Sequence, residues 1–85
     1  MKMFQIELTE QFDKNFSKIK DAGIRQQIYK KVCQLKDMAP LGKKLKGNPF
    51  WSVHIGRFRV IYVMRSTNIT VIDVLERKKE YKELR

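Results

Sequence analysis

The stretch Trp51-Ser52-Val53-His54-Ile55-Gly56-Arg57-Phe58-Arg59-Val60-Ile61-Tyr62 decides the fold of this 85-residue chain. Apolar and polar residues alternate before the glycine, and a second run of β-forming residues follows it. Alternation with a period of two predicts a half-buried strand, and a glycine followed by arginine suits the first central position of a tight hairpin turn. The stretch therefore predicts two paired strands, about Trp51 to Ile55 and Arg57 to Met64.

Two further strands are expected on either side of this region. Met3 to Leu8 alternates in the same way, with Phe4, Ile6 and Leu8 on one face. A turn at Ser66-Thr67-Asn68 leads to a last apolar run, Ile69 to Glu76. Both segments have the composition of strands bounded by turn residues.

The residues between the first strand and the hairpin predict two helices. Thr9 can cap the first helix, which carries Phe12, Phe16 and Ile19 at helical spacing before a break at Asp21-Ala22-Gly23. The second helix presents one apolar stripe and is expected to end near Met38, because Pro40 disfavours helical geometry in the preceding residue. The stripe consists of Ile24, Ile28, Val32 and Leu35.

The expected order is thus β-α-α-β-β-β in one domain spanning residues 1–85. A helical hairpin would pack on one face of a mainly antiparallel sheet, which is an α+β fold. A chain of this length has no room for a second core. Cys33 lies beside the apolar stripe and is expected to be a packed small residue.

Composition narrows the cellular setting. One cysteine excludes an internal disulfide and fits a reducing compartment, so a cytoplasmic location is expected. The N-terminus does not resemble a secretory signal, and no apolar run approaches the length of a membrane span, so no membrane association is expected.

The chain carries a net charge of +10, unevenly distributed. Residues 1–42 contribute +3 and residues 43–85 contribute +7, so the excess belongs to the strand-rich half. Such a field attracts polyanions, of which nucleic acid is the commonest. A basic protein with no polyanionic partner remains the alternative interpretation.

Two polar residues of the first hairpin strand, Ser52 and His54, should lie on the side away from the helices. Arg59 follows on the next strand, near the middle of the sheet. Two interpretations of Arg59 compete. It forms a cross-strand pair with Asp73, or it contacts an anionic ligand, for which a planar guanidinium is well suited.

Metal-independent ribonuclease chemistry needs few groups. A base takes the proton of a ribose 2′-hydroxyl, a cation stabilises the phosphate, and an acid protonates the leaving oxygen. His54 can serve as the base, since surrounding positive charge favours the neutral imidazole that accepts a proton. A lone strand histidine is also compatible with a structural role. With one histidine and one cysteine, neither a metal site nor a cofactor is expected.

The remaining basic residues are expected to steer or contact a polyanion. The long loop from Pro40 to Phe50 is rich in glycine, proline and lysine, and loops of this length are often functional. Tyr81 either stacks on a base or packs against the end of the sheet. The residues expected to bind RNA or the ribosome are Lys43, Lys44, Lys46, Ser52, Arg57, Arg65, Lys78 and Lys79.

The segments Leu45-Lys46-Gly47, Gly56-Arg57-Phe58-Arg59-Val60-Ile61-Tyr62 and the terminal Arg77 with Tyr81 together resemble the RelE/ParE toxin superfamily. The strand and helical hairpin that come first follow the same order, so the resemblance covers nearly the whole chain. It implies a compact microbial-ribonuclease-like fold and a toxin of a type II toxin–antitoxin system. RelE-type members enter the ribosomal A site, cut messenger RNA and are silenced by a partner antitoxin.

By position, the resemblance implies that Arg59 stabilises the scissile phosphate and that Arg77 acts as an acid or phosphate clamp. Tyr81 corresponds to a tyrosine that stacks on the substrate. Well-studied RelE members carry two lysines where this chain has Ser52 and His54, so His54 would replace a lysine base. The implied partners are a RelB-like antitoxin, the ribosome and mRNA, with DNA contacted only through the antitoxin.

Two alternatives to ribosome-dependent mRNA cleavage stay open at this point. In a ParE-like role the same scaffold inhibits DNA gyrase and cleaves nothing, and ParE-type members generally lack the catalytic residues. In the other, an attenuated toxin acts only within an antitoxin–DNA repressor complex. Retention of Arg59, Arg77 and Tyr81 favours the nuclease.

Overall fold

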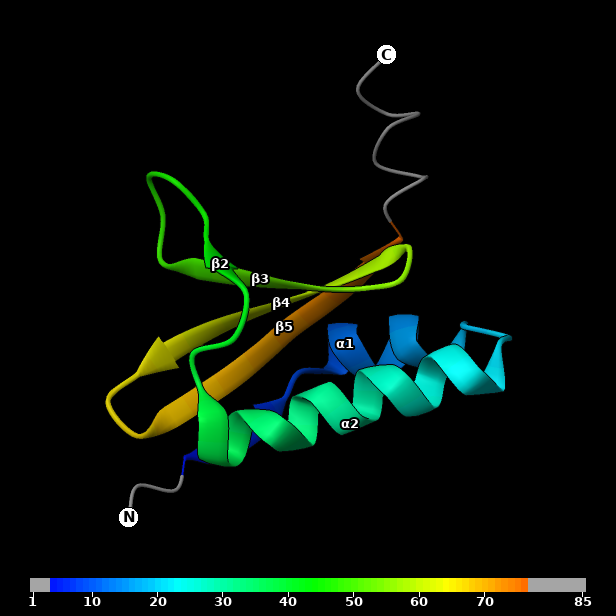
Figure 1. Ribbon diagram of the computed structural model, residues 1–85, viewed down its shortest axis with the longest axis horizontal. Coiled ribbons are helices and arrows are strands. Elements are labelled where there is room, and N and C mark those ends of the chain that lie inside the picture. The colour runs from blue at the N-terminus through cyan, green and yellow to red at the C-terminus, as the bar shows by residue number, and fades with distance from the viewer. Residues whose placement is uncertain (1–3, 77–85) are drawn as a thin grey trace.

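The computed structural model describes residues 4–76 of the chain. Two helices pack against one face of a five-stranded sheet, as Figure 1 shows. The helices are α1 (Glu10–Ser17) and α2 (Ala22–Met38), and the strands are β1 (Gln5–Leu8), β2 (Lys43–Lys44), β3 (Phe50–Ile55), β4 (Phe58–Arg65) and β5 (Asn68–Glu76). The predicted α+β class and its helical hairpin on one sheet face are confirmed.

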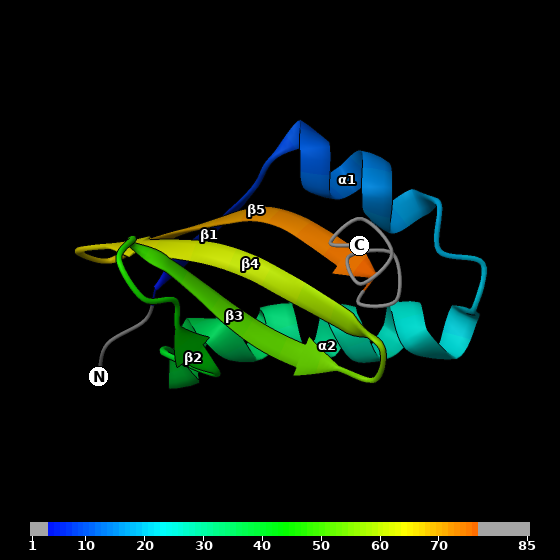
Figure 2. The same cartoon turned by 90° about the horizontal axis from the view of Figure 1, so that it is seen from above.

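The strands lie in the order β1-β5-β4-β3-β2, which can be followed across the sheet in Figure 2. β1 runs parallel to β5, and the other neighbours are antiparallel. β4 is therefore central, which explains why its residues are apolar on both faces: Val60 and Tyr62 are fully buried, while Ile61 and Val63 are half-buried.

Both helices begin at a capping side chain, of which the one at Thr9 was predicted and the one at Asp21 was not. The Thr9 side chain accepts a hydrogen bond from the Phe12 amide at 3.1 Å, and Asp21 accepts from the amides of Gly23 and Ile24. These caps satisfy amides that have no partner inside the helix. Gly23 thus lies in the first turn of α2 rather than in the break between the helices.

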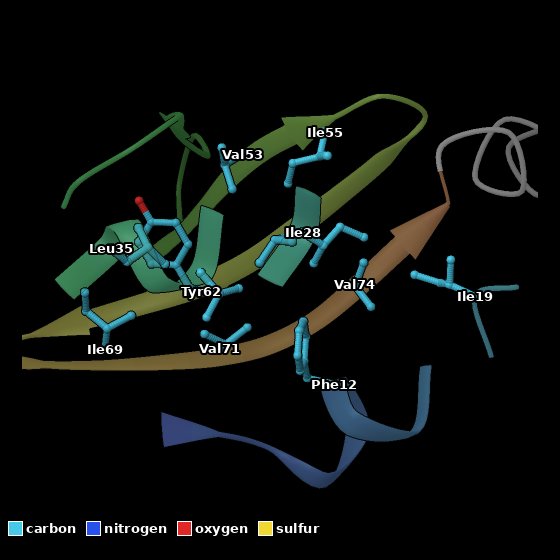
Figure 3. Close-up of a cluster of buried hydrophobic side chains, with 12 residues drawn as sticks. Phe12, Ile19, Ile28, Leu35, Val53, Ile55, Tyr62, Ile69, Val71 and Val74 are labelled. Atoms are coloured by element: carbon cyan, nitrogen blue, oxygen red, sulfur yellow. The ribbon is translucent and has the colours of Figure 1, made fainter. Parts of the chain in front are cut away.

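The core fills the layer between helices and sheet (Figure 3). From α2 it takes Ile28, Val32 and Leu35, the predicted stripe, with Ile24 half-buried at its edge. The prediction for Cys33 is wrong: its side chain is exposed, because position 33 lies on the flank of α2 that turns away from the sheet.

The loop predicted from Pro40 to Phe50 contains the short strand β2, which pairs with β3 at the edge of the sheet. The Tyr62 hydroxyl holds the start of this segment, accepting from the Leu41 amide at 2.8 Å and donating to the Leu41 carbonyl. Next to it, Gly42 adopts φ +85°, and a Cβ at this position would lie 2.1 Å from the Ser52 carbonyl oxygen. Only glycine allows this approach of two backbones.

Candidate nucleic-acid interface

The sheet face opposite the helices is the candidate interface. Among the described residues no helix covers it, while the loop of residues 45–49 rises at one end of it (Figure 1). Directly opposed residues on neighbouring strands point to the same face. Val53 and Val60, which oppose each other, are buried on the helix side, so the alternate residues of β3 and β4 belong to this open face.

His54 and Arg59 lie side by side on the open face. They are directly opposed in the β3–β4 register, which brings their Cβ atoms to about 4.5–5.5 Å from each other. The His54 side chain is exposed, and Arg59 is half-buried with its Nε atom fully buried. An imidazole and a guanidinium are thus carried by directly opposed positions on the same face.

The predicted alternative, a cross-strand pair between Arg59 and Asp73, does not agree with the strand register, because the two residues are not opposed. Arg59 opposes Leu75 on β5, and Asp73 opposes Ile61. Moreover, the Asp73 carboxylate accepts hydrogen bonds from Asn15 at 2.6 Å and Gln11 at 3.2 Å. A register shift after Ile61 places an extra residue in β5 at this point, and the carboxylate fastens α1 to the strand.

Ser52 lies on the predicted face of the sheet, but its side chain is buried rather than exposed. It opposes Ile61, on the same face as His54, yet it is only 3% exposed. A short side chain in the interior of a sheet lies below the level of longer neighbours on both strands, which explains its burial. Its Oγ has no hydrogen-bond partner within residues 4–76.

The register separates the lysines of the long loop. Lys43 opposes Ser52 and therefore belongs to the open face, whereas Lys44 opposes Trp51. Trp51 stacks on the buried Tyr62 ring at a centroid distance of 6.3 Å, so its position marks the helix side. The structure thus brings Lys43 to the candidate interface and places Lys44 on the other face. Lys46 is exposed in the loop that rises beside the interface.

Two predicted arginines lie away from the pair of His54 and Arg59. Arg57 is at the tip of the β3–β4 hairpin, where its guanidinium lies 3.8 Å from the Glu76 carboxylate and is 65% exposed. Arg65 ends β4, six residues and therefore about 20 Å from Arg59. Lys78, Lys79, Arg77 and Tyr81 fall outside the described residues.

A cleft of about 480 Å³ opens near the tip of the same hairpin. It is lined by residues of the α1–α2 connection, such as Lys20, and by Phe58 and Val74, but not by His54 or Arg59. This cleft is therefore separate from the candidate interface. Within residues 4–76 no group of three or more His, Cys, Asp or Glu could hold a metal ion. Neither helix that the structure describes is long and apolar enough to cross a membrane.

Sequence reasoning missed two residues that shape this surface. Tyr62 and Gly42 fix the path of the chain into β2, and β2 itself was not predicted. A glycine followed by two lysines gave no signal for a strand, because two residues are too short to show periodicity.

Comparison with known families gives one match over most of the chain. Residues 6–81 match the family described as ParE toxin of type II toxin-antitoxin system, parDE. No curated protein sequence matches the chain.

Solved structures show the same fold at low sequence identity. The RelB–RelE antitoxin–toxin complex of Methanococcus jannaschii matches with a TM-score of 0.74 and 22% identity, covering 93% of this chain and 99% of that one. The isolated RelE toxin of E. coli matches with a TM-score of 0.75 and 21% identity, covering 95% of this chain and 94% of that one. The chromosomal ParDE system of P. aeruginosa matches with a TM-score of 0.73 and 13% identity, covering 88% of this chain and 96% of that one.

Proposed function

The chain belongs to the ParE toxin family of type II toxin–antitoxin systems, and from this premise we propose that it is a toxin that cleaves translated messenger RNA. The observation that carries the proposal is the direct opposition of His54 and Arg59 on the open face of the sheet. This pair combines a proton acceptor with a phosphate-binding cation, the two functions that cleavage of a ribose-phosphate backbone requires first.

In the proposed reaction, His54 accepts the proton of a ribose 2′-hydroxyl. The 2′-oxygen attacks the adjacent phosphorus, and Arg59 stabilises the charge that develops on the phosphate oxygens. The bond to the 5′-oxygen breaks, that oxygen takes up a proton, and the products are a 2′,3′-cyclic phosphate and a 5′-hydroxyl end. DNA has no 2′-hydroxyl, so the reaction is restricted to RNA.

The proton donor and the base-stacking group are proposed from the chain that follows β5. β5 ends at Glu76, which opposes Phe58, and the preceding pair in the register is Arg59 with Leu75. Arg77 follows directly in the sequence, and Tyr81 lies four residues later. We assign Arg77 the role of acid or phosphate clamp and Tyr81 that of stacking on a substrate base.

The basic open face also supports the proposed partners. Lys46 in the loop, together with Lys43 and Arg59 on the strands, forms a basic surface that an anionic RNA or an acidic antitoxin can cover. A RelB-like antitoxin that buries this surface would silence the toxin, and release would expose it to the ribosome and mRNA in the cytoplasm.

Inhibition of DNA gyrase without nuclease activity is the second candidate. The observation in its favour is the family match itself, which is to ParE toxin, together with the fold shared with the ParDE system of P. aeruginosa. A gyrase inhibitor needs the scaffold and its surface but no proton acceptor beside a guanidinium. The two candidates therefore differ in whether His54 and Arg59 are required.

The purified chain is tested in a translating cell-free extract, with cleavage mapped by primer extension, and in a gyrase supercoiling assay. We expect cleavage of translated message, a loss of about 10²–10³-fold for Arg59→Ala and of about 10²–10⁴-fold for His54→Gln. Arg65→Ala removes the same charge as Arg59→Ala at the far end of β4 and should lose far less. Intact message together with inhibited supercoiling contradicts the nuclease and supports the gyrase inhibitor, and inactivity in both assays contradicts both and leaves a repressor component.

A further inference from the structure

The two lysines of β2 occupy opposite faces of the sheet, although they are adjacent in sequence. Lys43 opposes Ser52 and Lys44 opposes Trp51 in an antiparallel register. Trp51 packs against the core through Tyr62, which is fully buried. Because opposed residues share a face, the Lys43 side chain leaves the sheet on the side of His54, and the Lys44 side chain leaves it on the side of the helices.

Lys43 is close to the pair formed by His54 and Arg59. Its partner Ser52 precedes His54 by two residues on β3, so the two rows of opposed residues are neighbours on one face. Strand geometry gives about 7 Å along the strand and about 5 Å across it, which puts the Cα atoms of Lys43 and His54 about 8 Å apart. A lysine side chain spans most of that distance.

The row that contains Lys43 has no other cation. Its middle position is Ser52, buried and uncharged, and the next is the half-buried Ile61. The exposed Lys43 side chain leaves β2 on the same face as His54, one row away from it. The row ends at Asp73 on β5, opposite Ile61, so its positive charge comes from the edge strand rather than from β3.

The backbone of Lys43 is fixed on both sides. Before it, Leu41 is bonded to the Tyr62 hydroxyl and Gly42 packs against the Ser52 backbone. After it, the Leu45 amide donates to the Phe50 carbonyl at 2.8 Å. A cation on a fixed backbone is a more specific contact than one on a free loop, because less conformational entropy is lost when it binds.

We infer that Lys43 is a phosphate-binding residue of the open face, holding the RNA phosphate next to the one contacted by Arg59. The inference rests on the proposed function, since it takes single-stranded RNA as the ligand. The simpler explanation of both lysines is protection of a sheet edge against pairing with other chains. That explanation makes Lys43 and Lys44 equivalent, whereas the inference makes them different.

The test measures binding rather than cleavage. The ligand is a fluorescent single-stranded RNA with 2′-O-methyl riboses, which the proposed reaction cannot cut, and anisotropy titrations run from 50 to 200 mM salt. One lost phosphate contact on a single strand lowers the slope of log affinity against log salt concentration by about 0.7. Between 50 and 200 mM salt, the affinity of the parent should therefore fall by a factor about 2.6 times larger than the affinity of Lys43→Ala. Lys44→Ala, with the same loss of charge, should keep the parent slope.

A variant that keeps the charge gives the second comparison. Lys43→Arg keeps a cation at the same backbone position, and it should keep the slope of the parent. Circular dichroism and thermal melts of each variant check the fold. Equal slopes for Lys43→Ala and Lys44→Ala, or no detectable binding of this RNA by the parent, overturn the inference. Binding with the expected slopes but without cleavage in the translating extract overturns the nuclease and leaves the Lys43 contact intact.

Discussion

Replacing Tyr62 with phenylalanine should remove much of the stability of this domain while leaving its core shape unchanged. The Tyr62 ring lies in the core (Figure 3). Its hydroxyl accepts from the amide of Leu41 and donates to the carbonyl of Leu41. Tyr62→Phe leaves that amide and carbonyl without a protein partner. Each buried polar group left in this way costs about 1–3 kcal/mol. Leu41 is only half-buried, so water replaces part of the loss, and we expect about 2–4 kcal/mol in total.

This loss is large compared with the stability that a domain of this size has. At about 0.05–0.15 kcal/mol per residue, 85 residues give an unfolding free energy of about 4–13 kcal/mol. Trp51 is the only tryptophan and stacks on Tyr62, so urea unfolding followed by its fluorescence reports on this region. Tyr29→Phe makes the same chemical change at a side chain that is 60% exposed, and it should alter the free energy by no more than about 0.5 kcal/mol.

The pH dependence of unfolding gives a second measurement on the same hydroxyl. Burial raises the pKa of Tyr62 above its usual value of 10.0, an effect that the Leu41 hydrogen bond partly offsets. The folded chain therefore keeps this proton where the unfolded chain releases it. The contribution of this proton to the free energy of unfolding is fully present below pH 10. It is lost as the pH rises toward the folded-state pKa, at up to about 1.4 kcal/mol per pH unit. Since all other groups are common to the two variants, the expected result is a shallower decline of the unfolding free energy for Tyr62→Phe than for Tyr29→Phe.

Equal urea midpoints for Tyr62→Phe and Tyr29→Phe would contradict the predicted role of the hydroxyl. A destabilised Tyr62→Phe whose stability declines above pH 10 as steeply as that of the parent would show that this hydroxyl is not the buried group that titrates.

Three further predictions concern the backbone and the docking of α1. Gly42→Ala should lower the free energy of unfolding by more than about 3 kcal/mol, because the new Cβ would meet the Ser52 carbonyl. Gly47→Ala is the control: no atom lies within 4 Å of its Cβ position, so it should lose only the roughly 1–2 kcal/mol that a positive φ costs. Urea unfolding measures both. Ser66→Gly should raise the thermal midpoint, corresponding to about 0.5–1 kcal/mol, because Ser66 adopts φ 55° in the β4–β5 turn, and an unchanged or lower midpoint would contradict this. Asp73→Ala should increase hydrogen exchange in α1, since Asn15 and Gln11 lose their acceptor, and unchanged protection there would show that the helix is held by its apolar residues alone.

Much of the fold could be predicted because its signals are local. The Thr9 cap, the apolar stripe of α2 and the glycine of the β3–β4 turn each follow from a few neighbouring residues, and the structure has all three. Cys33 shows the limit of this approach. Its place next to a buried stripe suggested burial, but one helical position is a rotation of about 100°, which is sufficient to reach solvent.

The site depends on pairings between residues far apart in the sequence, and these are only partly predictable. The opposition of His54 and Arg59 follows from the tight turn between them, because a two-residue loop fixes the register. The opposition of Arg59 and Leu75 does not, since the extra residue in β5 shifts every later partner by one position. Likewise, the sequence alone does not reveal which lysine of β2 lies on which face, because this depends on the pairing of β2 with β3.

The division of the sheet into two faces also explains why one scaffold can serve different toxins. In β3 and β4 the core takes Val53, Val60 and Tyr62, while the alternate positions carry His54 and Arg59. A change of chemistry on the open face therefore leaves the buried set untouched, so RelE-like and ParE-like members can share a fold with few identical residues. It follows that a loss of function at the exposed His54 should occur without loss of stability, because its side chain contacts a different layer from the buried residues that alternate with it.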